Sequence, residues 1–521
     1  MTPLDLALPS QLMLALVPEI VLIGGAMLIL LWAGWKRESD NHQRVIGWAS
    51  LALVVVTTAA VVWSYRRFAP STAGPIAIDN FRWMIDIIIL VGTGLTIALA
   101  MDENRRERIH AAESHVLILF ASSGMMLLAA ATDLMIVFLG IELMSISVYA
   151  LAGINRRSAR GAEGALKYFL LGAFATAFLL YGIALVYGAT GSTNVQQIAG
   201  TIGTLGLTSS PLLIVGLAML VIGFGFKIAA VPFHMWAPDV YDGSPSAITA
   251  YMAATVKAAA FAAFIRVWLQ GFPAMGWEWY PSVFGISIAS MIAGNVIGLA
   301  QKSLKRMLAY SSIGHAGYLL VLMAGGTAEA TSALVFYLIA YTLATFGAFA
   351  GIVSLSQPGR GTVMINELSG LWSRRPWLAL GMGVMMMALL GFPIFGGAGF
   401  LAKWYVLQVA LHAPVKQMTL AVVLVLTTVV SAGYYLNVVM VMFMRQPADD
   451  PSVSEPPASG GMTRSVMFAT AVLLLLIGLA PDSLVTLTRS IRVETGRSRP
   501  RMGVATPTIP TLRPAQPTLS R

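Results

Sequence analysis

Residues 223–245 read Gly-Phe-Gly-Phe-Lys-Ile-Ala-Ala-Val-Pro-Phe-His-Met-Trp-Ala-Pro-Asp-Val-Tyr-Asp-Gly-Ser-Pro, and they carry the strongest indication of the architecture. It continues an apolar run that carries Lys227 and is then interrupted at Pro232. Proline removes a backbone donor and clashes with the preceding turn, so a helix through this stretch must break. Inside a membrane, such a break is tolerated only where protein or water satisfies the freed backbone groups.

A second stretch, residues 391–403, repeats this pattern with the sequence Gly-Phe-Pro-Ile-Phe-Gly-Gly-Ala-Gly-Phe-Leu-Ala-Lys. Its predicted helix-breaking residues are Gly391, Pro393 and Gly399. Lys403 follows them, as Lys227 accompanies the break at Pro232. Paired broken helices in two repeats point to an ion or substrate path. Two unrelated Gly/Pro-broken helices that serve only packing would give the same pattern. The lysine that both stretches share favours an ion or substrate path.

The composition places these breaks in a membrane. Of 521 residues, 57% are hydrophobic and only 11% are charged, with a mean hydropathy of +0.77. A soluble domain carries about 25% charged residues, so a soluble enzyme is excluded. The chain has no cysteine, which excludes cysteine-ligated iron–sulfur clusters, thiol catalysis and disulfides on this chain.

The hydropathy pattern predicts an all-α polytopic membrane protein with about fourteen transmembrane helices, since about 20 apolar residues span a bilayer. The predicted spans are 11–33, 45–65, 82–101, 115–131, 133–152, 163–188, 211–236, 245–269, 281–300, 305–324, 331–354, 377–411, 417–444 and 463–487. The first span is not a cleavable signal peptide, because no basic segment precedes it and Lys36 and Arg37 follow it.

The two broken helices, the seventh and the twelfth, divide the chain into units. We expect helices 1–3 in residues 1–114, a first five-helix repeat in 115–270, a second in 280–446 and helix 14 in 460–490. Because five is an odd number, the second repeat should be inverted relative to the first. Residues 491–521 form a basic, proline-rich tail that we expect to be disordered. Residues 489–521 supply +6 of the net charge of +10, which gives no reason to expect nucleic-acid binding.

Loop charge predicts the orientation, because cytoplasmic loops carry the excess of Lys and Arg. Loops after odd-numbered helices hold seventeen basic residues, and loops after even-numbered helices hold five. The odd loops should therefore face the cytoplasm, with both termini on the outer side of a bacterial plasma membrane.

Four charged residues are predicted at central depth in the membrane, where a charge costs about 2.5–3.5 kcal/mol on insertion scales. They are Glu142, Lys227, Lys257 and Lys403. Ser145 and Tyr149 share a helix face with Glu142. Burial favours the neutral form of a lysine and a nearby carboxylate opposes this, so a Glu–Lys pair that opens and closes can take up and release a proton. The alternative is that these charges form structural ion pairs between helices. Because four of them lie at central depth, we favour the relay over this alternative.

Other polar residues are weaker candidates. His315 lies inside the tenth span and could carry a proton between lysines or serve as a packing residue. His234 follows Pro232 and is a second possible relay residue. Within the first span, Glu19 follows Pro18 and is interpreted as a local structural pair. Asp86 lies near a span end and is expected to extend towards the interface. No phosphate-binding loop is present, so direct use of ATP or NADH is not expected.

These motifs resemble the subunit N family of the proton-pumping NADH–quinone oxidoreductase, respiratory complex I, whose mitochondrial counterpart is NADH dehydrogenase subunit 2. The resemblance covers roughly residues 11–490 and is strongest in Gly140-Ile-Glu-Leu-Met-Ser-Ile-Ser147, Lys227–Pro245 and Gly391-Phe-Pro393. It implies an antiporter-like fold, a relay through Glu142, Lys227, Lys257 and Lys403, and a polar relay group at His315. It also implies that NADH, FMN, iron–sulfur clusters and quinone bind to partner subunits, with no cofactor or metal on this chain.

Three alternatives remain open. Subunits L and M of the same complex and the multisubunit cation/proton antiporters share the fold, but they tend to carry an Ala-His-x-Glu-Ala-Pro type sequence where this chain has Val240-Tyr-Asp-Gly-Ser-Pro245. A non-pumping membrane scaffold is disfavoured, since it could replace buried charges with apolar residues. A small-solute carrier ranks last, because no polar cluster large enough for an organic substrate is evident. The expected partners are neighbouring antiporter-like and small membrane subunits and the lipid bilayer.

Overall fold

The computed structural model describes residues 7–35, 39–109, 112–357, 362–393, 397–413, 417–446, 460–489 and 491. Four basic residues used for the predicted orientation, Lys36, Arg37, Arg360 and Lys416, lie outside the described residues. The predicted tail also lies outside them, except for Ile491.

The described chain is almost entirely helical, as predicted. The N-terminal part and first repeat contain α1 (Ala7–Ala15), α2 (Val17–Trp35), α3 (Asp40–Arg67), β1 (Ser71–Ala73), β2 (Ile76–Ile78), α4 (Asn80–Glu107), α5 (Glu113–Ala130), α6 (Leu134–Ala152), α7 (Ala159–Thr190), α8 (Val195–Leu205), η1 (Leu207–Ser209), α9 (Pro211–Lys227), α10 (Ala237–Gly243), α11 (Ser246–Tyr251), the π-helical η2 (Met252–Val256) and α12 (Lys257–Gly271). The remainder contains η3 (Pro273–Met275), α13 (Gly276–Leu299), α14 (Leu304–Gly325), α15 (Ala328–Leu355), η4 (Ile365–Leu368), α16 (Leu371–Arg374), α17 (Pro376–Leu390), α18 (Gly397–His412), α19 (Met418–Met444), α20 (Gly461–Leu479) and α21 (Asp482–Arg489).

The membrane-spanning pattern agrees with the predicted one. Among the described residues, twelve helices are long and apolar enough to cross a membrane, and the two shorter apolar helices α9 and α17 bring the number to fourteen. Both shorter helices end at the predicted breaks, because α9 stops at Lys227 and α17 stops at Leu390.

Three local features depart from the prediction. A small antiparallel hairpin, β1–β2, follows α3 and turns at Gly74, which has a φ of +60° that favours glycine. An amphipathic helix, α8, follows α7 and buries Val195, Ile198 and Ile202 at helical spacing. The last predicted span divides into α20 and α21 just before Pro481, as expected for a residue preceding proline.

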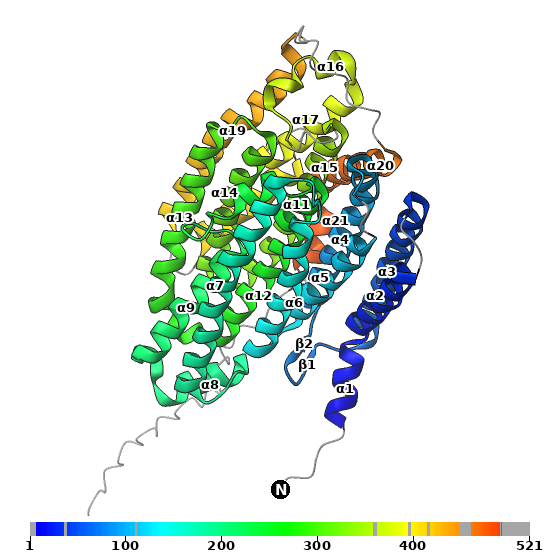
Figure 1. Ribbon diagram of the computed structural model, residues 1–521. Helices are drawn as coiled ribbons and strands as arrows, with labels where there is room; N and C mark the ends of the chain where they lie inside the picture. The colour runs from blue at the N-terminus through cyan, green and yellow to red at the C-terminus, as the bar shows by residue number, and fades with distance from the viewer. Residues whose placement is uncertain are drawn as a thin grey trace, which may run out of the picture.

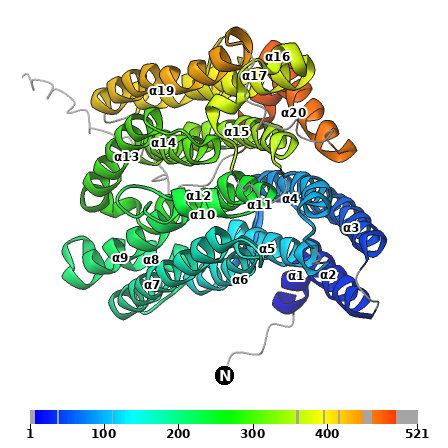
Figure 2. The ribbon, with the colours of Figure 1, turned by 45° about the horizontal axis from the view of Figure 1, so that its top comes forward.

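The helices form a layered bundle (Figure 1), and the helices at its centre are more deeply buried than those at its edges. Figure 2 shows α12, α14 and α15 in the interior, while α2 and α3 lie at one edge. In the apolar window of residues 246–271 every residue is buried, and the share is 94% for both α14 and α15. The corresponding share for α2 is only 28%, so α2 leaves most of its surface for lipid or partner subunits. Polar side chains buried on α12, α14 and α15 must therefore find partners within the protein.

Candidate functional site

The first broken helix ends at Lys227, and the chain then turns through Pro232 before α10 begins. Backbone groups freed by the break find side-chain partners. The indole Nε1 of Trp236 donates to the carbonyl oxygen of Phe226 at 3.1 Å, and Ser290 Oγ accepts from the backbone N–H of Val231 at 2.9 Å. These bonds satisfy irregular backbone that lipid could not.

Lys227 is buried against α6. Its Nζ donates to Ser145 Oγ at 2.6 Å and to Tyr149 OH at 3.2 Å, and lies 5.2 Å from the centre of the Tyr149 ring. Both partners share a face of α6 with Glu142, as the sequence spacing predicts. Glu142 itself is half-buried, and no described residue forms an ion pair with it. Direct coupling between Glu142 and Lys227 therefore stays a prediction.

Lys257 lies at the start of α12, immediately after the π-helical segment, and is only 1% exposed. Its Nζ donates to the carbonyl oxygen of Ser312 on α14 at 2.5 Å and also to the Ser312 hydroxyl. Tyr341 of α15 donates to the same hydroxyl at 3.0 Å. Lys257 is thus held between three helices by hydroxyl and carbonyl groups.

His315 lies one turn further along α14 and is fully enclosed by tyrosines. Its Nδ1 lies 2.6 Å from Tyr337 OH, and its Nε2 lies 3.3 Å from Tyr435 OH. Tyr435 also hydrogen-bonds to Ser311, and the His315 ring lies 4.8 Å from the Tyr341 ring, centre to centre. Both ring nitrogens therefore face hydroxyl groups that can donate or accept a proton.

Lys403 occupies the second broken helix. Its Nζ donates to the carbonyl oxygen of Leu390, the last residue of α17, at 2.8 Å, and lies 4.9 Å from the centre of the Tyr318 ring. Gly391 adopts a φ of +81° and Pro393 follows in a turn, as predicted for a break. Gly399 lies in the first turn of α18, where a side chain would collide with the carbonyl of Ala388, so it permits close packing across the break.

α14 connects the two central lysines. Ser312, His315 and Tyr318 lie three residues apart, so successive side chains rotate and the set turns through about 120° around the helix. Ser312 contacts Lys257 on one side, Tyr318 lies beneath Lys403 on the other, and the His315 and Tyr318 rings lie 5.6 Å apart. His234, by contrast, hydrogen-bonds to none of the four predicted relay residues in the described chain.

The tyrosines of this cluster were not predicted from the sequence. Tyr337, Tyr341 and Tyr435 lie in long apolar spans where an isolated tyrosine is equally typical of packing. A usable pattern existed in α14, because Ser311, Ser312, His315 and Tyr318 place four polar groups in fewer than three turns.

Two expectations about charges near the helix ends are corrected. Asp86 does not extend to the interface, because it is fully buried next to Arg82. Glu19 pairs with Arg82 on another helix at 2.7 Å and not locally. Outside the spans, Asp239 of α10 accepts from Lys167 and from Arg306, each at 2.8 Å. Burial would raise the pKa of Asp239, but these two hydrogen bonds outweigh it and hold its pKa below the usual value.

Comparison with known proteins gives concordant matches. Residues 131–431 match the family described as NADH:quinone oxidoreductase/Mrp antiporter, transmembrane. NADH-quinone oxidoreductase subunit N of Gemmatimonas aurantiaca is 47% identical over 491 residues, covering 92% of this chain and 94% of the relative. A chain of respiratory complex I from Thermus thermophilus superposes with a TM-score of 0.77 at 35% identity, covering 91% of this chain and all of that one. A chain of the Mrp complex from Dietzia sp., at 22% identity and a TM-score of 0.78, covering 92% of this chain and 96% of that one, shares the fold.

Proposed function

Because the chain belongs to the NADH:quinone oxidoreductase/Mrp antiporter membrane family, and within it to the subunit N group of NADH-quinone oxidoreductase, we propose that it moves protons through the four charged residues Glu142, Lys227, Lys257 and Lys403. His315 and its tyrosines lie between the last two of these residues. The chain is a membrane subunit of an enzyme complex, and the electron chemistry takes place elsewhere in that complex.

One observation carries the proposal: α14 presents a series of polar groups that begins at Lys257 and ends at the Tyr318 ring, which lies against Lys403. Hydrogen bonds run from Lys257 through Ser312 to Tyr341, and from Tyr337 through His315 to Tyr435. The His315 ring is also in contact distance of Tyr341. A set of structural ion pairs would need carboxylates, yet no described carboxylate pairs with Lys257, His315 or Lys403.

The groups present can hold and pass a proton. A lysine ammonium donates to a serine or tyrosine hydroxyl, and each hydroxyl can accept one proton while donating another. A neutral imidazole does the same with its two nitrogens. Charge on Lys257 disfavours charge on His315 and Lys403 by repulsion in a poorly screened interior, so one proton should advance as another arrives.

The remaining parts of the proposal concern the surroundings of this chain. Glu142 is half-buried on α6 with no ion pair in the described chain, which suits an exchange of protons with a neighbouring antiporter-like or small membrane subunit. NADH, FMN, iron–sulfur clusters and quinone would bind to partner subunits. Both termini would face outward in a bacterial plasma membrane. Single cysteines in this cysteine-free chain test the orientation, and labelling of position 157 from outside the cell would contradict it.

The relay is tested with lysine-to-methionine changes in the assembled complex. Lys257→Met and Lys403→Met keep side-chain length and remove the titratable group, so we expect normal assembly with reduced proton translocation and reduced coupled NADH oxidation. Lys257→Arg should also fail, because arginine does not release its proton. The matched control is Lys302→Met, at an exposed position outside the cluster.

The measurement is quinone-linked NADH oxidation together with pH-gradient formation in membrane vesicles, normalised to assembled complex. Wild-type pumping by the Lys257→Met and Lys403→Met complexes would exclude the relay and favour a scaffold. Poor assembly of both variants, with full pumping in whatever assembles, would lead to the same conclusion.

A further inference from the structure

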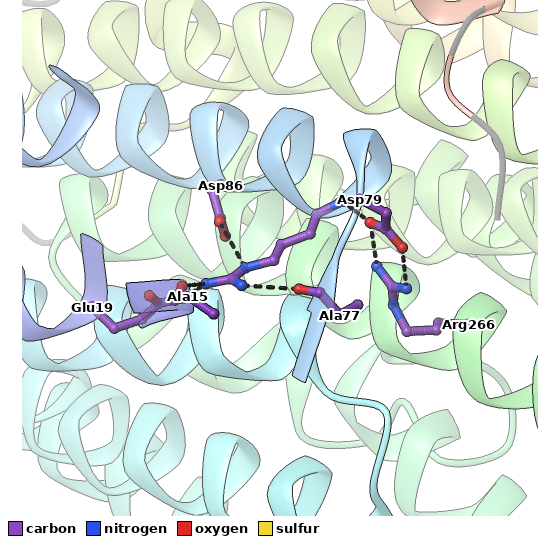
Figure 3. Close-up of polar contacts among 7 residues, drawn as sticks. Ala15, Glu19, Ala77, Asp79, Asp86 and Arg266 are labelled. Carbon is purple, nitrogen blue, oxygen red and sulfur yellow. Dashed lines mark hydrogen bonds and ion pairs between the residues drawn. The ribbon is translucent and has the colours of Figure 1, made fainter. Parts of the chain in front are cut away.

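A second buried charged cluster lies where α1, α2 and the β-hairpin meet α4 and α12 (Figure 3). Its five ionisable side chains are Glu19, Asp79, Arg82, Asp86 and Arg266. All of them except Asp79 have side chains that are at most 4% exposed. Nothing in the proposed relay uses these groups.

Half of the cluster is balanced. Arg266 binds Asp79 through two hydrogen bonds, of 2.6 and 3.0 Å, which is the bidentate geometry of a strong arginine–carboxylate pair. Asp79 also accepts from the backbone N–H of Arg82 at 2.8 Å and so caps α4. One positive and one negative charge cancel here, so this pair is expected to be ionised.

The other half is not balanced, because Glu19 and Asp86 share a single guanidinium. Arg82 Nη2 donates to Glu19 Oε1 at 2.7 Å and to the carbonyl oxygen of Ala15 at 2.8 Å, and Nη1 donates to Ala77 at 2.9 Å. Asp86 is left with Arg82 Nε at 3.5 Å, which is an ion-pair distance without hydrogen-bond geometry. Arg82 is therefore committed to Glu19 and to two backbone carbonyls.

Of the three carboxylates, Asp86 is the one that forms no hydrogen bond in the described chain. It is fully buried, and neither of its carboxylate oxygens has a hydrogen-bond partner among the described residues. The charged groups around it are Arg82, Glu19, Asp79 and Arg266. Arginines stay charged, so three ionised carboxylates against two guanidiniums would leave one uncompensated negative charge in a buried site. Proteins do not sustain an unpaired buried charge when a proton can remove it.

We propose that the Glu19–Arg82–Asp86 triad is a proton-binding site that holds one proton, shared between the two carboxyl groups and located mainly on Asp86. Two carboxylates that compete for one cation titrate as a unit and retain one proton between them. The bound proton makes the junction of α2 with α4 electrically neutral. Within the N-terminal helices, α2 is thereby attached to α4 through a contact that depends on one bound proton.

The test is infrared difference spectroscopy of the assembled complex at neutral pH, comparing each variant with wild type. Asp86→Asn should remove one protonated-carboxyl band, which shifts in D2O, without loss of an ionised-carboxylate band. Glu19→Gln should give the same result, because Asp86 then has Arg82 to itself and ionises. Glu163→Gln is the control, since Glu163 is a largely exposed carboxylate and should lose an ionised band only.

The two variants separate a shared proton from simple burial of Asp86. If the protonated-carboxyl band survives in Glu19→Gln, the proposal of a shared proton is wrong. Loss of an ionised-carboxylate band in Asp86→Asn would also contradict it. Both variants leave the site electrically neutral and should assemble at wild-type levels. Failure of both to assemble, with Glu163→Gln unaffected, would also contradict the proposal.

Discussion

The two broken helices hold their lysines in different ways. Lys227 precedes its break, at the end of α9, and is bound by hydroxyl side chains of another helix, α6. Lys403 follows its break, on α18, and is bound by a carbonyl of its own broken helix at Leu390. The first lysine therefore depends on packing between helices, and the second depends on the geometry of the break itself. The same sequence pattern thus gives one site set by tertiary contacts and one set by local backbone.

The largest expected effect is the loss of stability caused by a substitution that disturbs backbone packing at the second break. Gly399→Ala would force a methyl group into the carbonyl of Ala388, and backbone cannot move as a side chain can. We expect a loss of about 3 kcal/mol or more in stability, at the upper end for overpacking, and loss of most assembled complex. The matched change at the first break is Gly225→Ala, whose methyl would meet the Phe233 ring at 2.7 Å.

The Phe233 ring can rotate away, and alanine favours a helix by about 0.5–1 kcal/mol over glycine, so Gly225→Ala should leave assembly nearly unchanged. Thermal dissociation midpoints of the solubilised complexes measure both effects. Equal losses at the two positions would show that the breaks do not differ in the way described.

The second-largest effect is a loss of proton pumping at the first break, where Glu142 and Lys227 lie on different helices. Glu142→Gln and Lys227→Ala should each strongly reduce redox-driven pumping, and the double variant should lose less than the sum in free energy. For groups acting as a unit we expect an interaction of about 1 kcal/mol or more. Strictly additive losses in vesicle pumping assays would separate Glu142 from Lys227 and leave Ser145 and Tyr149 as the hydroxyl partners of the lysine in the described chain.

The smallest effects come from single hydroxyl groups. Tyr337→Phe removes the partner of His315 Nδ1, and one hydrogen bond of about 1 kcal/mol corresponds to about a fivefold loss in rate. Tyr149→Phe removes one of two hydroxyl partners of Lys227 and leaves Ser145, so less than a twofold loss is expected. Proton translocation per assembled complex is measured for both variants. A greater loss with Tyr149→Phe than with Tyr337→Phe would contradict this prediction.

Much of this architecture was predictable because the membrane imposes it. Apolar length marked the spans, and Gly and Pro beside a lysine marked both breaks, since these features act through local backbone chemistry. The hairpin β1–β2 and α8 lie in loops, where apolar length gives no information. The tyrosine cluster and the Arg82 cluster depend on which helices meet in space. Asp86 is six residues into α4, a position from which a side chain often reaches the interface, and only the packing of the surrounding helices encloses it.

The central claim is that Lys257 and Lys403 belong to one path through α14. The most direct test is proton translocation per NADH oxidised in vesicles carrying Lys257→Met, Lys403→Met or both changes, each normalised to assembled complex. A single path predicts that the double variant loses no more than the more impaired single variant, because either change interrupts the same route. A double loss equal to the product of the two single losses, or wild-type translocation in either single variant, would contradict the account.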